Sequence, residues 1–161
     1  MPIKDSREKF EHELADIYDA EHQFLEAQDM MLTNATDPKL KSLIEQHMEE
    51  TRGQIENLEK VFSSIDKEPQ RQTCSGAKGI VEEGSKAMDE AGTPELRDGM
   101  IATGATKAEH YEMVAYADLI QGAEMLKNRQ AVKLLTANRE QEVRTARKLE
   151  RVAPRLAKLA A

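Results

Sequence analysis

Apolar side chains recur at intervals of three and four residues along most of the chain, which is the spacing of one face of an α-helix. In the first segment they fall at positions 10, 14, 17, 18, 24 and 25, and this pattern predicts a helix over residues 5–35. Alternating apolar and polar residues, which mark half-buried strands, form no sustained run. The chain is therefore expected to be all-helical.

Capping residues followed by proline mark the starts of two further long helices. Asp37-Pro38 and Thr93-Pro94 each place a capping side chain directly before a proline at the first helical position. They predict helices over about residues 38–65 and 94–126, because the three-four apolar spacing continues through both segments.

Two more helices complete the predicted architecture. A short helix is expected over residues 74–91, and a long one over 130–158 in which Pro154 should kink or end the helix. Long helices joined by short turns pack as antiparallel neighbours in a bundle. The sequence therefore predicts an all-α single domain over residues 1–161, a four-helix bundle with an extra short helix between bundle helices two and three.

Each long helix carries an acidic residue within the stripe that should face the other helices. Glu21, Glu50 and Glu142 do so on the first, second and last long helices, and Glu109 and Glu112 on the third. Ionised carboxylates are costly to bury, and several that converge repel one another. A metal pair would supply counter-charge, and inward glutamates from four helices are typical of di-iron and di-manganese carboxylate bundles.

His47 precedes Glu50 by one helical turn and would share its face, which makes it a further candidate ligand. The plainer alternative is chance, because 33% of the chain is charged and a single inward glutamate most often lies at a helix edge or an interface. One glutamate on every long helix is harder to explain in that way. A non-enzymatic helical bundle with protonated or water-linked acids stays open as the second interpretation.

Four other residues bear on the candidate site. Tyr18 and Tyr116 are expected in the core, where their hydroxyls would reach an inward carboxylate. Cys74 begins the short helix, where a thiol pKa can be lowered, although a small buried filler is the favoured role. His110 lies off the apolar stripes and is expected at an edge or in solvent.

The charge, apolar content and cysteine count of the chain argue against several kinds of partner and location. The 30 acidic residues outnumber the 23 basic ones, so the basic face that nucleic-acid binding requires is not expected. No apolar run approaches the ~18 residues of a membrane helix, and the charged start does not resemble a signal peptide, so a cytoplasmic protein is expected. With one cysteine the chain has no rubredoxin-type iron centre, so a redox cycle would need an external electron donor.

Three segments, Glu13–Gln23, His47–Ile55 and Glu109–Tyr116, resemble the YciF-type family of bacterial ferritin-like proteins, and Cys74–Gly84 fits as well. The resemblance extends over residues 7–153. It implies a rubrerythrin-like four-helix bundle with an extra short helix, usually a homodimer, that is associated with stress responses.

The resemblance also implies a metal site. The cofactor would be iron, in the first instance a di-iron pair, with manganese or zinc less favoured, and the activity would be the handling of iron, O₂ or peroxide. Ferritin-like sites usually have histidine three residues after a ligand glutamate, where this chain has Gly53 and Thr145, and the family tends to have an acid where this chain has Ala146. These departures predict a metal site weakened on the last helix. The implied inward carboxylates are Glu21, Glu50, Glu112 and Glu142, with His47 and Glu109 as additional candidates.

Overall fold

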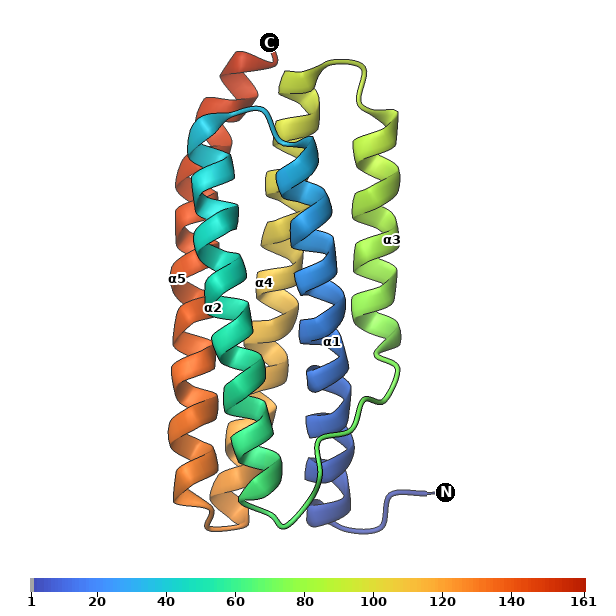
Figure 1. Cartoon of the computed structure of the whole chain (residues 1–161), viewed down its shortest axis with the longest axis vertical. Helices are drawn as coiled ribbons and strands as arrows, with labels where there is room; N and C mark the ends of the chain where they lie inside the picture. The colour runs from blue at the N-terminus through green and yellow to red at the C-terminus, as the bar shows by residue number, and fades with distance from the viewer. Residues whose placement is uncertain (1) are drawn as a thin grey trace.

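The computed structural model describes residues 2–161, which form five α-helices and no β-strand (Figure 1). Every predicted helix is present, and each predicted boundary lies within two residues of the observed one. One expectation was partly wrong, because Pro154 does not end the last helix, which continues through it. The elements are α1 (Ser6–Asn34), α2 (Pro38–Ser63), α3 (Ser75–Glu90), α4 (Pro94–Met125) and α5 (Arg129–Leu159).

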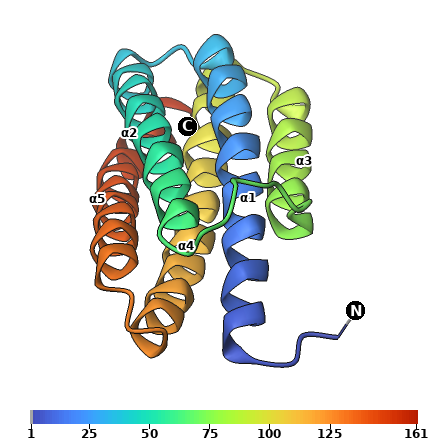
Figure 2. The same cartoon turned by 60° about the horizontal axis from the view of Figure 1, so that its bottom comes forward.

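The four long helices form a closed ring in the order α1, α2, α5, α4, and each is antiparallel to both of its neighbours (Figures 1 and 2). The short helix α3 lies outside this ring and packs on α1 and α4. Together with the loop that precedes it, α3 returns the chain along the bundle, so that α2 and α4 run in the same direction. The predicted four-helix bundle with an extra short helix between its second and third helices is confirmed.

Side-chain caps fix the starts of the helices. The Asp37 carboxylate accepts a hydrogen bond from the backbone N–H of Leu40 at 2.9 Å, and the Thr93 hydroxyl accepts one from Leu96 at 3.2 Å. Both are the caps expected from the sequence, since each satisfies a backbone donor that has no partner inside the helix.

The apolar core is divided into two clusters, one toward each end of the bundle. The larger includes Phe10, Leu58 and Leu135, and the smaller includes Leu40 and Leu149. The middle of the bundle between them is occupied by buried polar side chains. Because both clusters pack the same faces of the same helices, they hold these polar groups inside the bundle.

Asp98 on α4 ties the turn between α1 and α2 to the rest of the bundle. Its carboxylate is 3% exposed and accepts hydrogen bonds from the backbone N–H groups of Thr36 (2.8 Å) and Asp37 (2.9 Å) and from the Thr36 hydroxyl (2.6 Å). Arg155 on α5 binds the Asp37 carboxylate with two hydrogen bonds, at 2.6 and 2.7 Å. This clasp therefore joins all four long helices at one end.

Replacing Asp98 with alanine is expected to lower the free energy of unfolding by about 2–4 kcal/mol, because it leaves the buried backbone N–H of Asp37 and the partly buried one of Thr36 without an acceptor. Urea unfolding of the metal-free protein measures the effect. Asp89→Ala is the matched control, since Asp89 is exposed on α3 and its loss should cost less than about 0.5 kcal/mol. Equal unfolding midpoints for the two variants would show that the clasp does not stabilise the fold.

Candidate metal centre

The polar layer contains four glutamates and one histidine that are almost completely buried. Glu21, Glu109, Glu112 and Glu142 are each at most 1% exposed, and His47 is 5% exposed. They come from all four long helices: Glu21 from α1, His47 from α2, Glu109 and Glu112 from α4, and Glu142 from α5. The sequence placed all of them on the inward faces, and the structure brings them into one layer.

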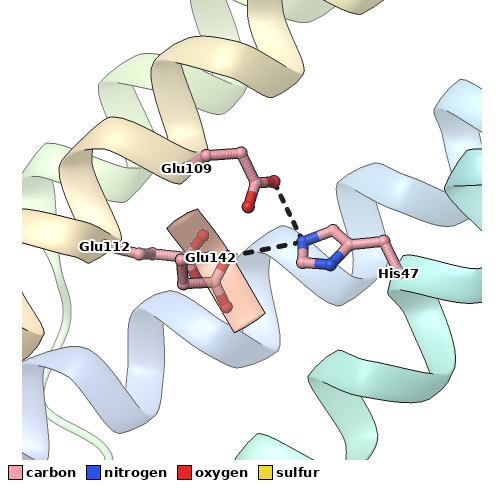
Figure 3. A group of neighbouring side chains, drawn as sticks. All are labelled: His47, Glu109, Glu112 and Glu142. Atoms are coloured by element: carbon pink, nitrogen blue, oxygen red, sulfur yellow. Dashed lines mark ion pairs between the residues drawn. The ribbon is translucent and has the colours of Figure 1, made fainter. Parts of the chain in front are cut away.

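Four of these side chains form a compact group (Figure 3). The Nε2 atom of His47 lies 2.9 Å from Glu109 Oε1 and 3.7 Å from Glu142 Oε2. One ligand atom from each of His47, Glu109, Glu112 and Glu142 lies within 4.8 Å of every other. Ligands on opposite sides of a divalent ion are about 4–5 Å apart, given bonds of roughly 2.0–2.5 Å. The spacing is therefore that of a metal-binding group.

Glu21 lies beside this group and is held in place by a hydrogen-bonded chain. The Tyr116 hydroxyl donates to Glu21 Oε1, and the Asn138 amide donates to the Tyr116 oxygen at 3.1 Å. Asn138 also donates to the backbone carbonyl of Gln54 at 3.2 Å. The Gln54 amide in turn donates to Glu142 Oε1. Two of the buried carboxylates thus each have one oxygen fixed by a neutral donor.

Glu50 lies at the rim of the layer, outside the compact group. Its side chain is 20% exposed, and its Oε2 atom lies 3.5 Å from His47 Nδ1 and 3.3 Å from Thr145 Oγ1. The two nitrogens of the imidazole therefore face different carboxylates, with Nε2 toward the interior and Nδ1 toward Glu50. A carboxylate on the far nitrogen orients a ligand histidine, and this is what the position of Glu50 allows.

Burial and mutual repulsion raise the pKa values of the inner carboxyl groups. Burial raises the pKa of Glu21 to about 7, against the hydrogen bond from Tyr116. Burial, with the nearby negative charges, also holds the pKa values of Glu112 and Glu142 well above their ordinary range. For His47 burial lowers the pKa, but the Glu109 carboxylate and its neighbours raise it more, to about 10. The hydrogen bond with His47 lowers the pKa of Glu50.

Each inner carboxyl group has one buried oxygen without a hydrogen-bond partner, namely the Oε2 atoms of Glu21, Glu109, Glu112 and Glu142. Within residues 2–161, none of these groups forms an ion pair with lysine or arginine. A buried acceptor without a partner is uncommon and costs free energy. Free carboxylate oxygens that converge with an imidazole nitrogen fit a divalent transition-metal ion.

The sequence predicted some, but not all, of the polar residues that surround the buried carboxyl groups. Tyr18 and Tyr116 both lie in the core as expected, and the Tyr116 hydroxyl reaches an inward carboxylate. The expected contact of the Tyr18 hydroxyl was wrong, because it donates to the exposed Glu59 at 3.0 Å. Asn138 and Thr145, which are 0% and 1% exposed, were not recognised as part of the layer. Both lie on the same inward stripe of α5 as Glu142, so their polarity at these positions was the signal that could have identified them.

Two minor candidates, Cys74 and His110, lie outside the compact group. Cys74 is buried, its Sγ lies 3.0 Å from the Tyr111 hydroxyl, and burial raises its pKa, so the favoured role as a buried filler fits better than that of a reactive thiol. His110 is exposed and lies 3.4 Å from Glu150.

Along residues 2–161, no helix is long and apolar enough to cross a membrane.

Comparison with known proteins gives consistent matches along the chain. The model of a family described as a domain of unknown function (DUF892) matches residues 5–161. Protein YciF of Escherichia coli K12 is 35% identical over 150 residues, 92% of this chain and 90% of YciF. The crystal structure of the E. coli stress protein YciF superimposes with a TM-score of 0.91 at 33% identity, covering 96% of this chain and 98% of YciF. YcfI from Rhodopseudomonas palustris, named as a candidate structural protein, gives 0.90 at 33% identity over 92% and 94%.

The metal-free protein is expected to lose stability as the pH rises from about 5 to 9. A group whose pKa is raised on folding stabilises the protein below its unfolded pKa and loses that contribution as the pH passes the folded value. For Glu21 this window runs from 4.5 to about 7, and for His47 from 6.5 to about 10. The depressed pKa values of Asp37 and Glu50 act only below this range. Burial lowers the pKa of His22, which opposes the decrease within the range but is a single group against the raised pKa values of the polar layer.

Urea unfolding in the presence of a chelator, repeated across this pH range, measures the dependence. The expected decrease is a few kcal/mol, since each pKa unit corresponds to about 1.4 kcal/mol. A free energy of unfolding that is constant or rises toward pH 9 would contradict the assigned charge states.

Proposed function

Because the chain belongs to the DUF892 family of YciF-like stress proteins, we propose that it binds a pair of iron ions in its polar layer and handles iron, O₂ or peroxide. The observation that carries the proposal is the set of four buried carboxyl groups with free oxygens around a single imidazole. Without a metal ion, His47 could balance the charge of only one ionised carboxylate, and further negative charge inside the bundle would be strongly unfavourable.

His47, Glu109, Glu112 and Glu142 would hold the metal directly, because their ligand atoms are close together. Glu21 would add a carboxylate from α1, and Glu50 would orient His47 from the rim. Bound ferrous iron would supply an electron and an open coordination position for O₂ or peroxide. An external electron donor would be required for turnover, since the chain has one cysteine.

A non-enzymatic role is the second candidate. The raised pKa values of Glu112 and Glu142 favour their neutral, protonated forms, which a bundle without metal would need. The similar protein YcfI is named as a candidate structural protein. A structural role predicts that Glu50→Gln keeps or increases stability, whereas metal binding predicts a lower melting temperature for this variant in metal-replete buffer. The homodimer implied by the resemblance stays a prediction.

Metal content per chain tests the proposal first. Protein loaded anaerobically with Fe(II) and desalted is expected to retain close to two irons per chain by plasma mass spectrometry, or about one if the site is weakened on α5. Loading should also raise the melting temperature, because a ligand that binds only the folded state stabilises it. A folded protein that retains essentially no iron would contradict the proposal and favour the structural role.

Glu142→Gln separates metal binding from simple burial. It removes the charge but preserves the shape, so the metal-free variant is expected to be as stable as the wild type or more stable. Its iron content should fall by at least about half, since one carboxylate ligand is lost. Glu150→Gln is the control on the same helix, where the exposed carboxylate should have no effect on iron content. Equal iron retention in both variants would place the metal elsewhere.

A further inference from the structure

A partly enclosed cavity lies beside the candidate metal centre, on the side of the bundle that α3 covers. All five helices contribute to its wall, and His47 and Glu109 are part of it, so the cavity borders the compact group directly. Gln28, Ser85 and Thr145 add further polar groups to the wall. The remaining lining residues are apolar or glycine, and they include Phe24, Met31, Ile44, Met88, Ala105 and Leu149.

The size of the cavity restricts what it can hold. Its volume is about 30 Å³. A site needs roughly 10–15 Å³ on this scale for one water-sized sphere, so there is room for about two, the size of a diatomic molecule. An apolar cavity that binds benzene has a volume of roughly 150 Å³, which is several times larger.

The chemistry of the wall restricts the occupant further. Water or hydrogen peroxide could bond to the polar groups of Gln28, His47 and Glu109, but against the apolar part of the wall it would lack most of its hydrogen bonds. Dioxygen makes no such demand, and it dissolves better in hydrocarbon than in water. The wall therefore favours dioxygen over peroxide at this entrance to the polar layer.

The side of the cavity formed by α3 is expected to open more easily than the sides formed by the long helices. Only Ala77 and Met88 are buried on this helix, and it packs mainly on α1 and α4. Elements with few buried apolar contacts open locally at low cost in free energy. Met31 and Met88 line the cavity, and unbranched methionine side chains adapt readily to small displacements.

We propose that this cavity binds dioxygen and delivers it to the carboxylate and imidazole groups of the polar layer. The use of dioxygen there rests on the proposed function. The binding of dioxygen in the cavity does not, because it depends only on the volume and the apolar wall.

Dissolved dioxygen is paramagnetic, so it tests the proposal directly on the metal-free protein. Methionine methyl groups labelled with ¹³C are observed by NMR under oxygen and under nitrogen. Met88 and Met48 are equally buried, at 8% and 7% exposure, but only Met88 lines the cavity. The relaxation enhancement at Met88 is expected to exceed that at Met48 by at least about threefold, and also that at Met125, which is 67% exposed.

A filled cavity provides the second measurement. Ala105→Leu places three additional carbons in the wall, and it should reduce the enhancement at Met88 to that at Met48. Ala115→Leu, the same change on the same helix, lies outside the cavity and should leave Met88 as in the wild type. If Ala105→Leu does not fold, the comparison of Met88 with Met48 in the wild type decides the question.

Equal enhancement at Met88 and Met48 would overturn the proposal, and so would an enhancement at Met88 that persists in folded Ala105→Leu. Failure of the proposed function has a different signature. In that case iron is not retained, while dioxygen still accumulates beside Met88. Retained iron without excess relaxation at Met88 would refute the cavity alone.

Discussion

The rest of the structure depends on how the bundle accommodates carboxyl groups that have no lysine or arginine partner. Glu21, Glu109, Glu112 and Glu142 are fully buried around a single imidazole, that of His47. Such a group of charges would drive the helices apart if nothing opposed it. Two apolar clusters, one on each side of the polar layer, oppose it by packing the same four helices, and the clasp at Asp98 closes one end.

His47 has a central position in this balance. It is the one cationic side chain that contacts the buried carboxylates within residues 2–161. Glu50 at the rim and the buried Thr145 contact its other nitrogen. Two neutral side chains donate hydrogen bonds to the buried carboxyl groups, Tyr116 to Glu21 and Gln54 to Glu142. Each inner carboxyl group still has one oxygen without a hydrogen-bond partner, and a metal ion would bind these oxygens.

The extra helix makes the two sides of the bundle different. Without α3, the cavity beside His47 and Glu109 would lose one of its walls. With it, the polar layer adjoins a mostly apolar space that has room for a diatomic molecule. Only two residues of α3 are buried, so this wall is expected to open locally at a lower cost in free energy than the ring of long helices.

The sequence by itself determined the helices, their boundaries and the inward direction of the buried acids, because periodicity, caps and prolines are local signals. For the same reason Glu21, Glu112 and Glu142 were recognisable as intruders on apolar stripes. Only the tertiary structure decided that Glu50 lies at the rim, that Tyr18 turns to Glu59, and that Asn138 supports Tyr116. These depend on the rotation of each helix against its neighbours, which arises from packing between segments 20 to 100 residues apart and leaves no mark in the local pattern.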